Sequence, residues 1–248
     1  MTRTFTAALL ALGLATPALA FDISAMSPAE RDTFRAEVRA YLMDNPEVLM
    51  EAIGVLEQRQ AAAQASNDET LVQVNAEDLF QDDHSWVGGN PEGDITLVEF
   101  TDYRCTYCRK AHDEVAELVK SDGNIRFIVK EFPILGEQSV ISSKFAIATL
   151  QVAGDAAYAK VSDALITFRG NLTPDSLGRL ATSLDLDADA ILARMDAPEV
   201  AAVIEANHAL AQRMQISGTP TFVLDGQMLR GYVPLDGMRQ IVAQVRAD

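Results

Sequence analysis

Cys105 and Cys108 are the only cysteines in the 248-residue chain, and two residues separate them. They closely follow the apolar run 95–100, which is typical of a β-strand. A helix beginning at Cys105 would lower the pKa of that thiol through its unpaired backbone N–H groups, and the thiolate is the reactive species. The spacing therefore predicts a redox dithiol. Cys105 is the expected nucleophile, and Cys108, nearly one turn deeper, is expected to resolve a mixed disulfide.

The cysteine pair has two alternative roles. A structural disulfide would close a very short loop and would restrict the unfolded chain little. A zinc site would need two further ligands, which His84 and His112 could supply, although neither stands at a spacing that favours such a site. The predicted exchange reaction needs no metal or organic cofactor.

Glu99 is a candidate for proton transfer. It lies in the apolar strand before the cysteines, on the same face as Leu97. Burial there would raise the pKa of its carboxyl and suit it to relay the proton of Cys108. The alternative is an exposed glutamate at a sheet edge. Arg104, Arg109 and Lys110 either add positive charge near the thiols or are ordinary solvated side chains.

Two helices are predicted near the N-terminus. Ser27, Pro28 and Glu30 form a capping-box pattern that predicts a helix over 28–44, and a second start at Asn45 predicts a helix over 46–65. Their large apolar residues fall at helical spacing and form an apolar stripe: Phe34, Val38, Leu42, Leu49, Ile53 and Leu56. This stripe packs either on the chain's own catalytic domain or on a second copy, and we predict self-association through 28–65.

The rest of the chain divides into a linker and one domain. We assign 21–66 to the helical extension, 67–85 to a polar linker and 86–248 to the catalytic domain, with a turn-rich approach over 86–94. Within the domain the patterns predict the following elements: strands 95–101 and 125–130, a helix between them, a helical insertion over about 136–215, a hairpin around Asp225–Gly226, and a last helix over 234–247. This order predicts an α/β fold with a mixed sheet.

Residues 1–20 have the pattern of a secretory signal. Arg3 precedes the apolar stretch 5–15, and Ala18–Ala20 resembles a cleavage site, so we predict cleavage near Ala20 and a periplasmic location. An uncleaved anchor is the alternative, but the stretch is shorter than the roughly 20 residues that cross a bilayer. The net charge of −16 disfavours nucleic acid and anionic membranes as partners.

Three pieces, in this order, resemble the thioredoxin fold and its DsbA-like branch. They are Glu99–Cys108, the helical insertion, and Gly218–Thr221, and the resemblance covers about 86–247. It implies a thioredoxin-like fold with a helical insertion, preceded here by an N-terminal helical extension. Members carry an acid six residues before the first cysteine, which Glu99 matches, and often pair it with a lysine on the next strand, which Lys130 matches.

The resemblance also implies a substrate-binding surface. Thr219 and Pro220 match the cis-proline loop that faces the dithiol, where a client chain would pair with the backbone. Thr106 and Tyr107 lie between the cysteines, where DsbA-type oxidases commonly carry Pro-His. An aromatic residue there, with threonine before the proline, is more similar to the isomerases of the DsbC and DsbG kind and to ScsC, the suppressor-of-copper-sensitivity protein.

We therefore expect a thiol-disulfide oxidoreductase that forms, reduces or isomerises disulfides. Its expected partners are cysteine-containing exported proteins and a membrane redox protein. An oligomer would shield the dithiol from an oxidising partner, which tilts the prediction towards isomerase or reductase. A chaperone, or a copper carrier that uses the two thiolates as soft ligands, is the rival from another class.

Overall fold

The computed structural model describes residues 23–247, which fall into two compact units that divide between Arg59 and Gln60. The first unit holds a 3₁₀ turn at Ile23–Ala25, helix α1 (Pro28–Asp44) and the first part of helix α2 (Glu47–Val74). The capping box at Ser27 is present, and α1 has the predicted bounds. The predicted signal segment 1–20 lies outside the described residues.

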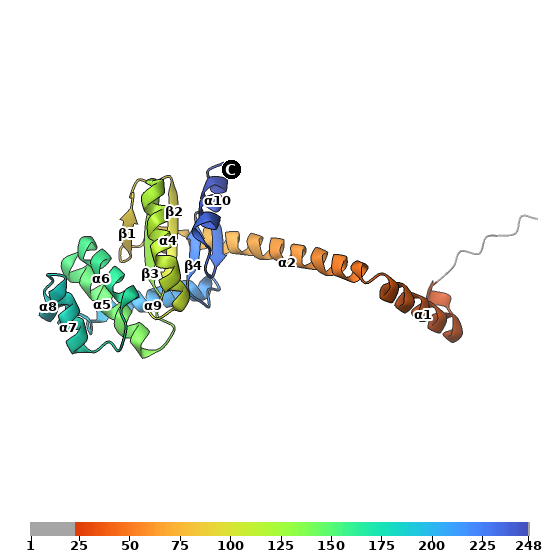
Figure 1. Cartoon of the computed structure of the whole chain (residues 1–248), viewed down its shortest axis with the longest axis horizontal. Coiled ribbons are helices and arrows are strands. Elements are labelled where there is room, and N and C mark those ends of the chain that lie inside the picture. The colour runs from red at the N-terminus through yellow and green to blue at the C-terminus, as the bar shows by residue number, and fades with distance from the viewer. Residues whose placement is uncertain (1–22, 248) are drawn as a thin grey trace, which may run out of the picture. The chain divides into compact units, whose positions relative to one another are not determined.

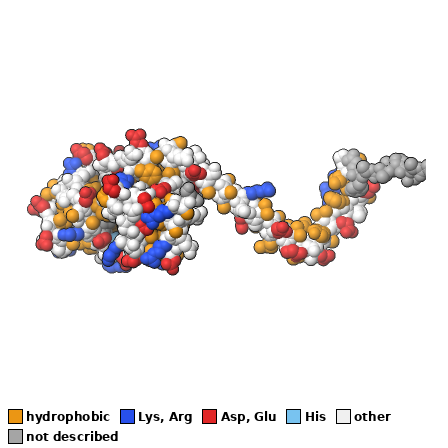
Figure 2. Space-filling model, turned by 90° about the horizontal axis from the view of Figure 1, so that it is seen from above, with side chains coloured by type: hydrophobic (Ala, Val, Ile, Leu, Met, Phe, Trp, Pro, Cys, Tyr) orange, Lys and Arg blue, Asp and Glu red, His pale blue; other side chains and the backbone are white. Residues whose placement is uncertain are grey.

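The N-terminal apolar stripe does not form a core within the first unit. Helix α1 buries none of its residues. Five of the six stripe residues are exposed: Phe34, Val38, Leu49, Ile53 and Leu56. Figure 2 shows such hydrophobic side chains along the surface of this helical segment. A stripe of this kind needs a partner surface to become buried.

The second unit contains the end of α2 and all remaining elements (Figure 1). In chain order these are α3 (Ala76–Phe80), β1 (Trp86–Gly89), β2 (Ile95–Thr101), α4 (Thr106–Asp122), β3 (Ile125–Glu131), α5 (Glu137–Ala153), α6 (Asp155–Thr167), α7 (Pro174–Ser183), α8 (Ala188–Arg194), α9 (Pro198–Arg213), β4 (Thr221–Leu224), β5 (Gln227–Arg230) and α10 (Leu235–Val245). The helical insertion, the hairpin and the last helix are therefore where the sequence predicted them. Within residues 23–247, no helix is long and apolar enough to cross a membrane.

The five strands form one mixed sheet in the order β1-β3-β2-β4-β5. Strand β2 is central, parallel to β3 and antiparallel to β4, while β1 and β5 form the edges. Six of the seven residues of β2 are buried, as expected for a strand covered on both faces. This central strand delivers the chain directly to the two cysteines.

Helices cover both faces of the sheet. Leu97 of β2 packs in one apolar cluster with α4 and α10, whereas Val98 and Phe100 pack in another with α9. The insertion helices α5–α8 form a third cluster beside β1 and β3 (Figure 1). Because side chains alternate along a strand, Glu99 shares the α4 face with Leu97. Glu99 lines the same cavity as Cys108 and Val115 of α4.

Most of the predicted linker 67–85 is helical. Helix α2 runs to Val74 instead of ending near residue 65, and α3 follows at Ala76–Phe80, whereas residues 81–85 lie outside any helix. Asp68 and Val72, one turn apart, are both buried, and Arg230 of β5 donates to the Asp68 carboxylate at 2.7 Å. Composition indicated a stretch that could bury little, but Gln, Ala and Glu favour helices, and the ion pair with β5 supplies the missing anchor.

The predicted turn-rich approach at residue 86 is partly a strand. Trp86–Gly89 forms β1, which pairs antiparallel with β3 in the register Trp86↔Val129. A Cβ at Gly88 would collide with the Trp86 ring, so the glycine lets the indole fold back over its own strand. The two glycines that indicated a turn therefore serve close packing in an edge strand.

Candidate active site

Cys105 occupies the N-cap position of α4. The backbone N–H of Cys108 donates to Cys105 Sγ at 3.3 Å. A hydrogen bond from the Cys108 side chain is the largest cause that lowers the pKa of the Cys105 thiol, to about 5; contacts from Thr219 and from the backbone N–H groups of Tyr107 and Cys108 add to it. Cys105 is thus a thiolate at neutral pH, as nucleophilic attack requires.

Cys108 has the opposite character. Its side chain is only 1% exposed, and both cysteines are free. Its hydrogen bond to Cys105, followed by burial and the charge of Glu99, raises the pKa of the Cys108 thiol far above its ordinary value. The pair therefore consists of one ionised and one protonated sulfur. This asymmetry allows the first sulfur to attack a client while the second holds its proton in reserve.

Thr219 and Pro220 face the nucleophile. The peptide bond between them is cis, as the resemblance implies. Cys105 Sγ lies 3.2 Å from the Thr219 carbonyl oxygen, which accepts from the sulfur only while the thiol is protonated, and a hydrogen bond from the Thr219 side chain lowers the Cys105 pKa. Residues 114 positions apart thus meet at one sulfur atom.

Thr106 and Tyr107 are both exposed between the cysteines, with Tyr107 59% exposed. The Tyr107 ring stacks near that of Tyr232, with centroids 6.2 Å apart, and Lys110 Nζ lies 4.1 Å from the Tyr232 centroid. Glu114 accepts from the Tyr232 hydroxyl at 2.7 Å. Sequence reasoning missed Tyr232, because only folding brings the end of the hairpin beside the dithiol.

Glu99 is buried on the α4 face of the sheet. Burial raises the pKa of its carboxyl to about 8, and the charges of Cys105 and Glu131 act in the same direction. Its own charge raises the pKa of Cys108. The edge-exposed alternative is wrong, because β2 is the central strand.

Lys130 does not pair with Glu99. The β2–β3 register aligns Glu99 with Val129 and Phe100 with Lys130, so the two charged side chains point to opposite faces. Lys130 is fully buried on the other face, where Nζ pairs with the Asp82 carboxylate and donates to the Asp78 carbonyl at 2.8 Å. The predicted pairing of Lys130 with Glu99 is therefore wrong, because the β2–β3 register places Val129, and not Lys130, opposite Glu99.

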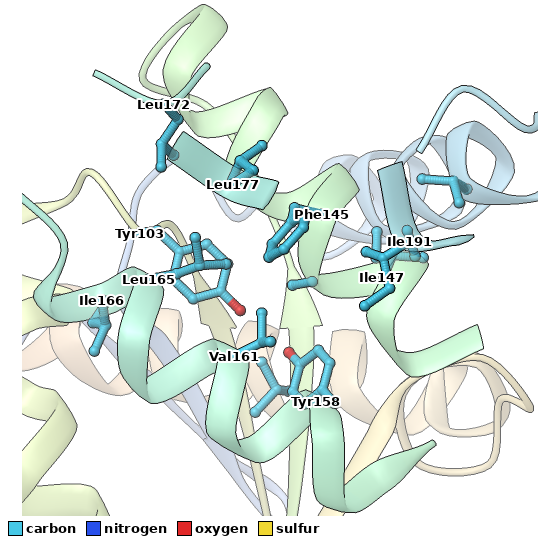
Figure 3. Close-up of a cluster of buried hydrophobic side chains, with 14 of the residues drawn as sticks. Tyr103, Phe145, Ile147, Tyr158, Val161, Leu165, Ile166, Leu172, Leu177 and Ile191 are labelled. Atoms are coloured by element: carbon cyan, nitrogen blue, oxygen red, sulfur yellow. The ribbon is translucent and has the colours of Figure 1, made fainter. Parts of the chain in front are cut away.

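A second buried carboxyl group, Glu131, was not predicted. Its Oε1 accepts from the hydroxyls of Tyr103 and Tyr158, each at 2.6 Å, and its Oε2 accepts from Ser143 at 2.7 Å. Figure 3 shows the two tyrosine hydroxyls directed towards each other within the apolar cluster. Burial raises the Glu131 pKa to about 7. The sequence signal that could have indicated this group is the charged residue Glu131 at the end of the apolar strand β3.

The arginines near the cysteines hold a loop. Arg104 Nη1 donates to the Gly170 carbonyl at 3.2 Å, and Arg109 donates to the carbonyls of Tyr103 at 2.9 Å and Phe168 at 3.2 Å. These contacts tie the loop after α6 to the start of α4. The interpretation of both arginines as plain solvated side chains is therefore wrong.

The two histidines considered as zinc ligands have other partners. His112 Nε2 lies 3.1 Å from the Asp163 carboxylate of α6, and His84 lies beside Asp82 and Asp83. Among residues 23–247, no three His, Cys, Asp or Glu side chains group together as a metal site would require.

The fold and this thiol pair define a thioredoxin-fold protein of the thiol-disulfide exchange class, with DsbA-like and ScsC-like architecture. The sequence model described as "Thioredoxin" matches residues 81–244, so the chain belongs to the thioredoxin family. The model described as "Copper resistance protein ScsC N-terminal domain" matches residues 30–63.

Three solved structures illustrate the similarity. A thioredoxin-like oxidoreductase from Silicibacter pomeroyi is 38% identical, covers 70% of this chain and 99% of its own, and has a TM-score of 0.65. ScsC from Proteus mirabilis in a transitional conformation is 25% identical, with 90% and 98% covered and a TM-score of 0.66. The thiol-disulfide exchange protein alpha-DsbA2 from Wolbachia pipientis shares the fold at 22% identity, with 74% and 98% covered and a TM-score of 0.69.

The first curated relatives that the chain matches are much longer. A Na⁺/H⁺ antiporter from Salinispora arenicola is 30% identical over 166 residues, which is 66% of this chain and 25% of the antiporter. The chain therefore spans about a quarter of the length of these relatives.

Proposed function

We propose that the protein is an exported thiol-disulfide oxidoreductase in which Cys105 forms a mixed disulfide with a client and Cys108 resolves it. The opposite pKa shifts of the two thiols support this proposal most directly. A sulfur of low pKa is ionised at neutral pH and can therefore attack, and it is a good leaving group when another thiolate displaces it. Because the aligned stretch covers a quarter of the antiporters, ion transport is not proposed.

The reaction runs through two exchanges. The Cys105 thiolate attacks a client disulfide, forming one new S–S bond and releasing the other client sulfur as a thiolate. Cys108 then gives its proton to Glu99 and attacks Cys105 Sγ, which releases the second client sulfur. The client gains two electrons and the protein becomes the disulfide. The reverse sequence oxidises a client dithiol.

The proposal includes a periplasmic location and a class of client proteins. The signal pattern of residues 1–20 and the structural likeness to a periplasmic thioredoxin-like protein from Salmonella support a periplasmic location. The expected clients are exported proteins with cysteines, and a membrane redox protein would restore the dithiol or disulfide. Mass analysis of the protein from a periplasmic fraction should give a chain that starts near Phe21.

The experiment that tests the chemistry separates the two cysteines. Cys108→Ala should accumulate a mixed disulfide through Cys105, whereas Cys105→Ala should accumulate none. The wild-type pair, equilibrated with glutathione, should have a potential between about −120 mV and about −270 mV, because its thiol pKa lies between those of DsbA and thioredoxin. Equal trapping by both variants would refute the assigned roles.

The choice between oxidase and isomerase needs a second assay. Refolding of a client with scrambled disulfides measures isomerisation directly, and oxidation of a reduced client measures disulfide donation. We favour isomerase or reductase, because self-association of the N-terminal helices would keep an oxidising membrane protein away from the dithiol. Isomerisation no faster than that of the isolated 60–248 unit would count against this preference.

Copper binding is a second candidate, favoured by the match of residues 30–63 to a copper resistance protein domain. The two thiols lie side by side, and thiolates are suitable ligands for Cu(I). Titration of the reduced protein with Cu(I) should then show one equivalent bound, and replacement of both cysteines by serine should abolish binding. Chaperone activity, in contrast, would survive that double replacement.

A further inference from the structure

A cavity of about 450 Å³ lies between α4, α6 and strands β1–β3. Its walls are mainly apolar and include four aromatic rings, those of Trp86, Tyr103, Phe127 and Tyr158. The volume lies within the range of about 300–1,000 Å³ that small-molecule sites occupy. The cavity is therefore large enough for a molecule of one or two rings.

The aromatic wall is held in place by several contacts. The indole of Trp86 stacks on Tyr158 at 5.3 Å and meets Phe127 edge-on at 6.0 Å. Trp86 Nε1 donates to the Asp155 carbonyl at 3.1 Å, and Gly88 leaves the space that the indole occupies. The edge strand β1 therefore places a fixed indole against the insertion helix α6.

The inner end of the cavity reaches the redox site. Glu99, Thr101 and Cys108 all line it, on the side of the sheet that α4 covers. At the more exposed side, His112 of α4 and Asp163 of α6 approach within 3.1 Å. A molecule in the cavity would thus touch Glu99 and the back of the resolving cysteine while leaving Cys105 and the cis-proline loop free.

We propose that this cavity binds a neutral aromatic small molecule that carries one hydrogen-bonding group. The rings would contact Trp86 and Tyr158, and the polar group would reach Glu99 and Thr101. An anion is disfavoured at the inner end, because burial there already raises the pKa of the Glu99 carboxyl and would penalise a second negative charge in the same way; Lys120 and His112 are the basic groups among the lining residues. A long apolar chain would not use the aromatic wall.

Occupancy should also affect the dithiol, a consequence that rests on the proposed function. The bound molecule would cover Glu99, so the proton of Cys108 could no longer pass to solvent through it. Resolution of the mixed disulfide should slow while attack by Cys105 is unchanged. Binding itself is measured without any exchange reaction, so the cavity and the enzymatic proposal can fail separately.

The test uses the fluorescence of Trp86, the only tryptophan of the chain. Reduced full-length protein is titrated with 4-phenylbutanol, and its carboxylate analogue 4-phenylbutanoate is the matched ligand control. We expect a saturable fluorescence change with the alcohol, at least about tenfold weaker binding of the carboxylate, and a rise in melting temperature with the alcohol alone.

Two variants place the binding in the cavity. Ala159→Phe on α6 fills it, and Ala156→Phe, exposed on the same helix outside the lining, is the matched control. Ala116→Phe fills it from α4 in case the first variant misfolds. Binding should weaken at least about tenfold in the filling variants and persist in the control. No saturable change in the wild type, or equal binding by Ala159→Phe and Ala156→Phe, would overturn the proposal.

Discussion

The carbonyl oxygen and the side chain of Thr219 act on the nucleophile in opposite directions. Its carbonyl accepts from the Cys105 thiol and so favours the protonated form, while its side chain stabilises the thiolate and lowers the Cys105 pKa. Thr219→Val removes the hydroxyl but keeps the shape and the carbonyl. The pKa of Cys105 should therefore rise, and the redox potential should fall.

The size of this effect follows from linkage. One unit of pKa corresponds to about 1.4 kcal/mol, which equals about 30 mV for a two-electron couple. Ultraviolet absorbance of the thiolate against pH measures the pKa, and glutathione equilibration measures the potential. Thr221→Val, whose hydroxyl bonds the Gly218 carbonyl instead, controls for disturbance of the loop. An unchanged Cys105 pKa in Thr219→Val would show that the Thr219 hydroxyl does not stabilise the thiolate.

The lowered pKa of Cys105 also predicts a pH-dependent stability. The folded pKa is about 5 against an ordinary value of 9.0, so the reduced form gains stability that is fully present above about pH 9 and is lost as pH falls through about 5. The oxidised form has no thiol to ionise at this position. Denaturant unfolding of both forms should show the advantage of the reduced form shrinking from about pH 8 to about pH 4. A constant difference would contradict the assigned thiolate.

Glu99 combines a cost to folding with a role in proton transfer. Its folded pKa of about 8 exceeds the ordinary value of 4.5, so the stability it contributes is present below about pH 4.5 and is lost as pH rises through 8. Glu99→Gln should therefore be more stable than the wild type at neutral pH, by a few kcal/mol, and the difference should grow towards pH 8.

The same Glu99→Gln replacement should slow resolution by Cys108. The glutamine cannot accept the Cys108 proton, so the rate should fall by about a hundredfold and lose its increase towards pH 8. Stopped-flow decay of a preformed mixed disulfide measures this step, and the rate of Cys105 attack is the internal control. A variant that is both more stable and equally fast would make Glu99 a buried acid without a catalytic role.

At the scale of elements, the sequence predicts those features that depend only on neighbouring residues. The strand before Cys105, the capping box at Ser27 and the hairpin at Asp225–Gly226 each depend on adjacent residues, and each is where the sequence placed it. The partner of Lys130 depends instead on which residues of β2 and β3 align. Register is a tertiary property, since a shift of one residue turns every side chain to the other face.

Other differences have the same physical origin. The composition at the start of the segment 67–85 indicates a linker, because the contact that anchors this segment, the ion pair between Asp68 and Arg230, joins residues far apart in the sequence. Strand β1 contains two glycines whose use becomes clear only once the Trp86 ring lies over Gly88. The site residue Tyr232 and the carboxyl of Glu131 likewise depend on contacts between distant segments.

Lys130 is a structural residue in this arrangement and should behave as one. Lys130→Met keeps most of the volume but leaves the buried Asp82 carboxylate without its cation, which should destabilise the fold by about 3 kcal/mol. The Cys105 pKa and the resolution rate should stay as in the wild type. Denaturant unfolding measures the first effect, and the double variant Lys130→Met/Asp82→Asn should recover part of the loss. A changed Cys105 pKa in Lys130→Met would show that Lys130 influences the active site and would contradict a purely structural role.

At the scale of the whole molecule, the exposed apolar stripe of α1 and α2 predicts that the chain self-associates. The stripe residues lie on the unit that divides from the catalytic one at Arg59, and α1 buries none of its own residues. Helices with this spacing pack by inserting the side chains of one helix between those of another. Self-association would bury the stripe and gather several dithiols in one particle, which suits a protein that must rebind a client repeatedly to isomerise it.

The prediction for assembly is tested with charge on the stripe. Leu49→Glu/Ile53→Glu places two carboxylates at exposed stripe positions, and Gln58→Glu, exposed on the same helix outside the stripe, is the control. Light scattering after size exclusion should give a multiple of the chain mass for the wild type and the control, and a single chain mass for the double variant. The monomer should keep the Cys105 pKa and its exchange with glutathione, because the catalytic unit is intact. It should lose isomerisation of a scrambled client and gain susceptibility to an oxidising membrane partner.

Two outcomes would contradict this prediction. A wild type that is monomeric at micromolar concentration would refute self-association. A monomeric variant with full isomerisation would show that isomerisation does not depend on assembly.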